Sequence, residues 1–241
     1  MKLDLENKRV LLTGVTSGIG EAIALGLLEE GCHIVGIDKS ASLLSLVQNE
    51  VIDFEAEDGL DQISYLLHGM PLEFDVLINA AGVSIGHSLY DDKIFRTSIR
   101  VNLEVPFLIS SILIQQNIKA GKKLSIINVT SLGAILGFPN NPSYQITKAA
   151  LGQLSRSIST DYARYGIRAN NLVPGYINSG MTQSSWDDIE LRNQRTARTS
   201  AGRWGQPNEL VGAVKFLSSD MSSYVTGTDL VVDGGWSSKG L

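Results

Sequence analysis

Short apolar runs alternate along the chain with longer segments in which apolar residues recur at helical spacing. Turn-forming residues bound most of the runs, which is typical of strands buried in a parallel sheet. The expected strands cover residues 10–12, 33–37, 51–54, 75–79, 124–129, 168–173 and 230–232. The expected helices cover residues 21–30, 40–49, 58–68, 92–119, 144–165 and 207–218, and residues 176–202 should form a polar loop with one or two short helices. The pattern predicts a single α/β domain over residues 1–241, a doubly wound parallel sheet of about seven strands with helices on both faces.

The first strand and helix are joined by a glycine-rich turn, Thr13–Gly20, and Asp38 ends the second strand. Glycines let the backbone turn tightly and approach a pyrophosphate at the positive end of the following helix. An acid about twenty residues later can accept hydrogen bonds from the adenosine ribose of a dinucleotide. The alternative is a tight turn that binds nothing, because glycine also serves turns and caps.

Composition narrows the class of protein. The chain has 241 residues, of which 43% are apolar, and a net charge of −5 from interspersed acids and bases, which argues against a nucleic-acid partner. The single cysteine, Cys32, follows a helix-ending glycine, which predicts a buried, inert thiol and fits a reducing, cytoplasmic setting. Neither a signal peptide nor a membrane span is expected. His33, His68 and His87 lack metal-ligand spacing, so no metal is expected.

Tyr144 and Lys148 form a second candidate site, one helical turn apart and after the strand that leads to Ser131. An ammonium beside a phenol favours the phenolate, so Lys148 is predicted to lower the pKa of Tyr144 and make it a usable acid or base. Ser131 can donate a hydrogen bond to a carbonyl oxygen on which charge develops. Taken alone, this spacing is common, and the alternative is an exposed pair on a helix.

In their order along the chain, these motifs resemble the short-chain dehydrogenase/reductase family. The matching segments are Thr13–Gly20, Asn79–Gly82, Asn102, Ser131, Tyr144 with Lys148, Pro174 with Gly175, Arg203–Glu209, Thr226 with Gly227, and Asp233–Gly235. The resemblance covers the whole chain and implies a Rossmann-type fold. It also implies hydride transfer between a nicotinamide and a carbinol carbon, with no metal in the chemistry.

The resemblance implies roles for individual residues. Tyr144 would be the acid/base and Lys148 would bind the nicotinamide ribose, while Ser131 would orient the substrate oxygen and Asn102 would hold a water of a proton relay. The residues implied at the cofactor are Gly14, Thr16, Ser17, Gly18, Ile19, Gly20, Asp38, Asp53, Asn79, Ala80, Ala81, Gly82, Tyr144, Lys148, Pro174, Gly175, Ile177 and Ser179. The segment before Asp53 is short for the family, which leaves the adenine contact there open.

The resemblance also bears on cofactor, substrate and assembly. Asp38 favours NAD over NADP, and the sequence as a whole looks most like 3-oxoacyl-[acyl-carrier-protein] reductases, which interconvert a secondary alcohol and a ketone. The substrate would then be a small molecule or a group linked to an acyl carrier. The alternatives are a small polyol, hydroxyacid or diol dehydrogenase, or a regulatory protein that binds nucleotide without turnover. Helices 92–119 and 144–165 are expected to pair across a two-fold axis in a homotetramer.

Overall fold

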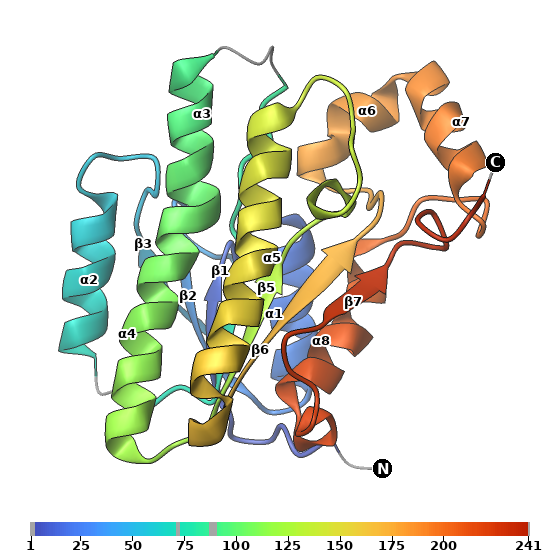
Figure 1. The fold of residues 1–241 in the computed structure, drawn as a ribbon. Coiled ribbons are helices and arrows are strands. Elements are labelled where there is room, and N and C mark those ends of the chain that lie inside the picture. Colours follow the sequence, from blue (N-terminus) through green and yellow to red (C-terminus); the bar gives the residue numbers. More distant parts are fainter. Residues whose placement is uncertain (1–2, 71–72, 87–90, 241) are drawn as a thin grey trace.

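A seven-stranded sheet forms the centre of the protein in a computed structural model that describes residues 3–70, 73–86 and 91–240 (Figure 1). All neighbouring strands are parallel, in the order β3-β2-β1-β4-β5-β6-β7. The strands are β1 (Arg9–Thr13), β2 (His33–Asp38), β3 (Val47–Val51), β4 (Val76–Asn79), β5 (Leu124–Val129), β6 (Ile167–Pro174) and β7 (Asp229–Val232). The strand order reverses between β1 and β4, where a crevice for ligands is expected beyond the carboxyl ends.

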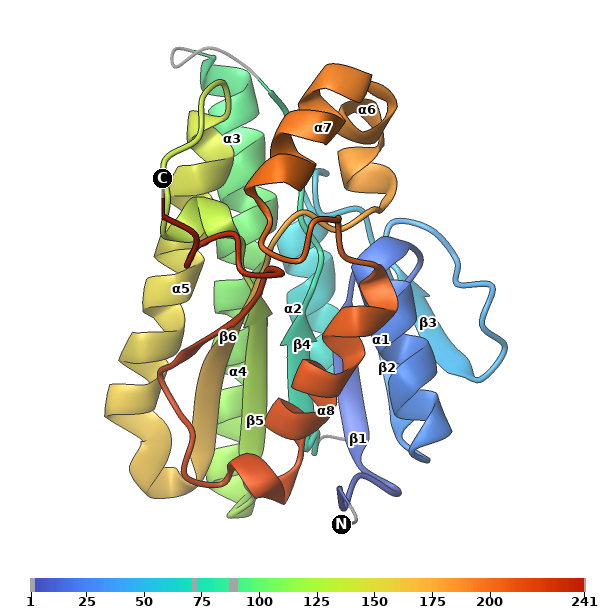
Figure 2. The ribbon, with the colours of Figure 1, turned by 90° about the vertical axis from the view of Figure 1, so that its right-hand side faces the viewer.

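Helices cover both faces of this sheet, as the sequence predicts (Figures 1 and 2). The helices on one face are α2 (Gly59–Gly69), α3 (Asp92–Ile99), α4 (Val105–Ala120) and α5 (Pro142–Tyr162). Figure 2 shows the other face, with α1 (Gly18–Glu29) and α8 (Val211–Ser218). The Rossmann-type α/β prediction is therefore confirmed.

Two apolar clusters, one on each side of the sheet, fix these helices. Successive strand residues point to opposite faces. Leu11 accordingly packs in a cluster with Ile109 of α4, whereas Leu12 packs with Leu27 of α1 and Val214 of α8. All five side chains are fully buried. Burial on both faces is why the central strands read as continuous apolar runs rather than alternating ones.

The long helix predicted over residues 92–119 is present, but a π-helical turn, Arg100–Glu104, joins α3 to α4. The combined rod, Asp92–Ala120, has the length and composition of a membrane span, yet 56% of its most apolar window is buried inside the protein. A helix packed in this way against a sheet is apolar because it contributes to the core.

The segment between Asp38 and Phe54 differs from the prediction. Residues 40–49 form no helix, and the third strand is Val47–Val51 rather than residues 51–54. Leu43 and Leu46 are 95% and 76% exposed. These two apolar residues, which suggest a helical pattern in the sequence, therefore do not pack against the core. Instead, an irregular connection returns the chain so that β3 can pair with β2 at the sheet edge.

Two short helices lie above the carboxyl ends of the strands (Figures 1 and 2). They are α6 (Gln183–Asp187) and α7 (Ile189–Arg198), in the segment predicted to be a polar loop with short helices. His87, which the sequence places in the loop after β4, lies outside the described residues.

Candidate active site

The glycine turn between β1 and α1 is packed so closely that side chains would not fit. Gly14 has a φ of +75°, and a Cβ there would lie 2.7 Å from the backbone nitrogen of Ala81. A Cβ on Gly20 would collide with the carbonyl oxygen of Gly14. Gly18, with a φ of +56°, would meet only Ser179 within 4 Å and therefore leaves open space beside it. The turn has the shape of a cradle at the positive end of α1, which suits a pyrophosphate.

Hydrogen bonds hold the carboxylate of Asp38 beside this cradle. Its Oδ2 accepts from the backbone nitrogen of Thr16 at 3.0 Å and from the Thr16 hydroxyl at 2.8 Å. Its Oδ1 accepts from the backbone nitrogen of Lys39 at 2.7 Å. Thr16, which the resemblance places at the cofactor, thus holds the Asp38 carboxylate in position.

A cavity of about 200 Å³ extends from the glycine turn to the end of β2. Asp38 and Asp53 both line it, together with Lys39 and Glu55. Despite the short connection before β3, Asp53 therefore still lies in the wall of the same cavity as Asp38. The glycine turn, the carboxylates of Asp38 and Asp53 and the open space beside Gly18 fit a nicotinamide dinucleotide.

Residues that follow β4 line this first cavity, but Asn79, the last residue of β4, does not. Ala80, Ala81 and Gly82 line the cavity, as the sequence predicts. Asn79 is fully buried, and its Nδ2 donates to Oδ1 of Asn128 on β5 at 2.7 Å. We conclude that the Asn79 side chain ties neighbouring strand ends together below the groove rather than lining it.

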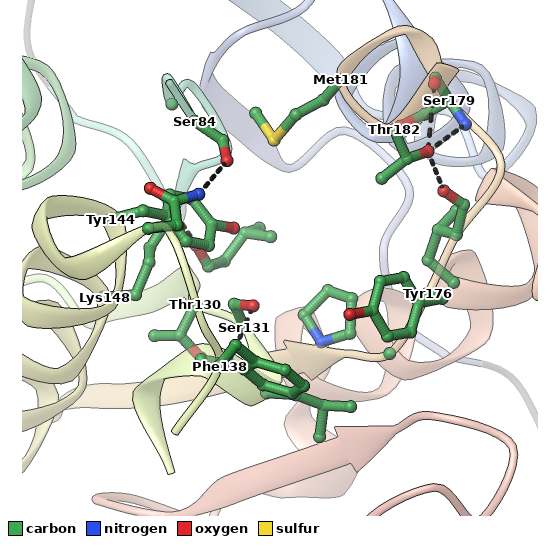
Figure 3. Close-up of a pocket in the computed structure, with 18 of the residues that line it drawn as sticks. Ser84, Thr130, Ser131, Phe138, Tyr144, Lys148, Tyr176, Ser179, Met181 and Thr182 are labelled. Atoms are coloured by element: carbon green, nitrogen blue, oxygen red, sulfur yellow. Dashed lines mark hydrogen bonds between the residues drawn. The ribbon is translucent and has the colours of Figure 1, made fainter. Parts of the chain in front are cut away.

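A second cavity, of about 250 Å³, continues from the first (Figure 3). The residues that line both are Ile19, Ala80, Gly82, Ser179 and Met181. The second cavity is also lined by Ser131, Tyr144 and Lys148 and by the predicted residues Pro174, Gly175 and Ile177. The structure therefore places nearly every predicted site residue along one groove above the switch point of the sheet.

Ser131 and Tyr144 meet within this second cavity. Ser131 follows β5 and its Oγ accepts from the backbone nitrogen of Gly133 at 3.1 Å, which fixes the side chain. Tyr144 stands in the first turn of α5 and lines the same cavity as Ser131, near enough that Ser131 affects the pKa of the phenol. Two hydroxyl groups are thus available to one substrate oxygen.

The pKa values of this group differ in part from the prediction. Burial raises the pKa of Tyr144, and its hydrogen bond with Ser131 offsets part of that rise. The predicted lowering by Lys148 is not found, because Nζ of Lys148 lies 5.8 Å from the Tyr144 ring centroid and donates to the carbonyl of Val129 at 2.8 Å. Burial also lowers the pKa of Lys148 to about 8, since a charged group loses hydration there.

Asn102 occupies the π-helical turn and is fully buried. Its Oδ1 accepts from the backbone nitrogen of Val83 at 2.8 Å, and its Nδ2 donates to the carbonyl of Val83 at 2.9 Å and to Oγ1 of Thr147 at 3.0 Å. Asn102 therefore clamps the loop after β4 to α5, beside Lys148. The widened helical turn is what brings this amide into the site, as π-turns often do.

The sequence does not single out the individual residues in the wall of the second cavity that faces Tyr144. Figure 3 shows Tyr176 and Thr182 across the cavity from Tyr144 and Lys148, and Phe138 at its edge. Arg195 of α7 also lines this cavity. These residues come from four separate segments, so only the tertiary fold brings them together.

No group of three His, Cys, Asp or Glu side chains could hold a metal ion within the described part of the chain. The predicted inert thiol is found: Cys32 is buried and its Sγ donates to the carbonyl of Leu5. Burial raises the pKa of this thiol to about 11.

The similarity to known proteins extends over almost the whole chain. The family model described as enoyl-(acyl carrier protein) reductase matches residues 14–237. A 2-dehydro-3-deoxy-D-gluconate 5-dehydrogenase from Pseudoalteromonas atlantica is 36% identical over 249 residues, which cover 98% of each chain. A solved gluconate 5-dehydrogenase from Burkholderia cenocepacia, in complex with NADP and tartrate, is 32% identical, with a TM-score of 0.92 and coverage of 99% of this chain and 98% of that one. A 4-hydroxyisoleucine dehydrogenase complexed with NADH is 28% identical, with a TM-score of 0.91 and coverage of 97% and 100%.

Proposed function

The chain belongs to the short-chain dehydrogenase/reductase family, and on that premise we propose that it interconverts a secondary hydroxyl and a ketone of a sugar acid with NAD(H). The observation that carries this is the continuous groove, which joins the dinucleotide cradle to the cavity of Ser131 and Tyr144. Two of the named relatives are dehydrogenases of gluconate and of 2-dehydro-3-deoxy-D-gluconate, which favours the hydroxyacid alternative among our predictions.

A bound nicotinamide would accept or supply the hydride. The residues of the chain would hold the cofactor and manage the proton. Gly18 and its neighbours would cradle the pyrophosphate, Asp38 would accept from the ribose hydroxyls, and Lys148 would donate to the ribose beside the nicotinamide. The preference for NAD over NADP is part of this proposal, since the relatives include structures with each cofactor.

Tyr144 would exchange the proton with the reacting oxygen. Its raised pKa keeps the phenol protonated near neutral pH, so it can donate to a ketone as the alcohol forms. In the opposite direction the phenol must first lose its proton, and the hydrogen bond from Ser131 stabilises the resulting phenolate. Ser131 would also donate to the substrate oxygen while charge develops on it.

The carrier-protein reading has less support than the sugar-acid one. The pairwise relatives named above are dehydrogenases of small molecules, and the second cavity is compact, at about 250 Å³. A regulatory protein without turnover is disfavoured because Ser131, Tyr144 and Lys148 line the same cavity and Asn102 lies beside Lys148. We further propose one domain over residues 1–241, a cytoplasmic setting, and a homotetramer.

The test is a spectrophotometric assay of nicotinamide reduction and oxidation by the purified protein. The panel contains gluconate, 2-dehydro-3-deoxygluconate, a neutral polyol such as sorbitol, and a 3-oxoacyl thioester with NADH. We expect the highest kcat/KM with one of the sugar acids. Turnover of the thioester alone would restore the carrier-linked function, and turnover of none of them would contradict the proposal.

A further inference from the structure

Among the residues that the structure describes, two cationic side chains and no carboxylate line the second cavity. The cations are Lys148 and Arg195. Lys148 donates to the carbonyl of Val129, whereas none of the described carboxylates forms an ion pair with Arg195. A half-buried guanidinium beside a cavity, without an acid to balance it, favours an anion in that cavity.

Aromatic rings hold the Arg195 guanidinium in place. Its central carbon lies 4.6 Å from the Tyr176 ring centroid and 5.9 Å from that of Trp204. Tyr176 in turn contacts Trp204 at 5.1 Å and Trp236 at 4.9 Å between centroids. A guanidinium on an aromatic face keeps donors at its edges, and these donors match the geometry of a carboxylate.

The position of Tyr176 shows on which wall of the second cavity Arg195 lies. Tyr176 lies across the cavity from Tyr144, so Arg195 belongs to the wall that faces the proton-transfer group (Figure 3). A substrate with a hydroxyl at Tyr144 would therefore place its other end at the wall that carries α7. We propose that Arg195 binds the substrate carboxylate and thereby selects sugar acids over neutral polyols, an assignment that rests on the proposed function.

The alternative is that Arg195 only fastens α7 to the aromatic wall. The neighbouring arginines of the same helix show what such a role looks like. Arg192 lies over Trp186 at 5.2 Å, Arg198 lies over Trp236 at 5.3 Å, and neither lines the second cavity. Arg198→Gln is therefore a matched control for Arg195→Gln, because it removes the same charge and the same kind of ring contact outside the cavity.

The first test compares kcat/KM for the preferred sugar acid and for a neutral polyol in both variants. Hydrogen bonds to charged groups contribute about 1.5–3 kcal/mol, which corresponds to about a 10- to 150-fold loss. We expect Arg195→Gln to lose that factor with the sugar acid, mainly through a higher KM, and to change less than about threefold with the polyol. Arg198→Gln should leave kcat/KM unchanged for both substrates. Equal losses with both substrates in Arg195→Gln would show a structural role and overturn the inference while leaving the proposed function intact.

The second test measures binding without turnover. Tartrate is titrated into the protein with NADH present, and tryptophan fluorescence reports binding because Trp204 contacts the Arg195 guanidinium. We expect saturable binding to the wild type and to Arg198→Gln, and a Kd at least about tenfold higher for Arg195→Gln. Failure of the wild type to bind tartrate, or equal Kd values for all three proteins, would overturn the assignment even if no substrate is turned over.

Discussion

Replacement of Asp38 by serine should relax the proposed preference for NAD over NADP. The structure fixes the Asp38 carboxylate with three hydrogen bonds, two from Thr16 and one from the backbone of Lys39. The carboxylate therefore has little freedom to turn away from a ligand at the end of β2. An NADP 2′-phosphate placed beside it would meet a fixed negative charge.

The magnitude follows from the charges of the cavity. Two unit charges about 4 Å apart at an effective dielectric near 20 repel by roughly 4 kcal/mol. Asp38 is only half-buried, so solvent and salt reduce this figure, and we expect a preference for NAD of roughly tenfold to a thousandfold. Lys39 is the only cation among the described residues that line this cavity. Its ammonium lies 3.8 Å from the Glu55 carboxylate, which reduces its attraction for a phosphate.

The assay compares kcat/KM for NAD and NADP with one sugar acid at fixed ionic strength. Asp38→Ser removes the charge and keeps a small hydroxyl, so NADP use should rise while NAD use falls with the lost ribose acceptor. Glu57→Gln is the control, because Glu57 is exposed and lies outside the residues that line the cavity. It removes the same net charge and should leave the ratio unchanged.

Equal use of both cofactors by the wild type would refute the reasoning. So would an Asp38→Ser variant with the wild-type ratio, since the argument depends on one carboxylate. A similar shift in Asp38→Ser and Glu57→Gln would assign the preference to overall charge instead of to the ribose site.

Three further predictions concern the proton transfer, the buried lysine and the assembly. Tyr144→Phe should leave NADH binding unchanged, measured by fluorescence titration, and lower kcat by at least roughly 10²- to 10⁴-fold; near wild-type turnover would remove Tyr144 from the mechanism. Lys148→Met should raise the unfolding temperature near pH 7, because burial holds the Lys148 pKa at about 8 and charging it costs up to about 3 kcal/mol. This gain should shrink as the pH rises from about 8 towards 10.5, where the folded lysine is neutral, and an unchanged gain would contradict the pKa direction. Phe107→Glu on α4, where Phe107 is 59% exposed beside a groove between α4 and α5, should dissociate the proposed tetramer in light scattering, and a monomeric wild type would contradict the assembly.

The fold was largely predictable because its signals are local. Buried strands such as β5 are continuous apolar runs, and helix ends such as Gly121 adopt the left-handed conformation that glycine favours. The connection before β3 was not predictable, because Leu43 and Leu46 imitate a helical face while the structure leaves both exposed. Whether an apolar residue finds a partner is decided by tertiary packing.

The candidate site was also only partly predictable from the sequence. Tyr144 and Lys148 lie one helical turn apart, so their proximity follows from the sequence, whereas their pKa values depend on burial and on the carbonyl of Val129. Arg195 was missed because its ring partners, Tyr176 and Trp204, lie elsewhere in the chain. The spacing of three arginines along α7 was visible, but nothing in the sequence says which of them reaches the cavity.

The two ends of the groove carry opposite net charges, so the proposed cofactor preference and the proposed substrate preference have separate electrostatic origins. Among the described residues, the proposed cofactor end holds the carboxylates of Asp38, Asp53 and Glu55 and the ammonium of Lys39. The proposed substrate end holds Lys148 and Arg195 and, within the same part of the chain, no acid. Such a groove disfavours an additional phosphate at the first end and favours a carboxylate at the second. The two effects act on different ligands through residues at opposite ends, so they should be independent. A double variant, Asp38→Ser with Arg195→Gln, should therefore show the sum of the two free-energy changes within about 0.5 kcal/mol. A larger departure would mean that cofactor binding and the substrate cavity are coupled.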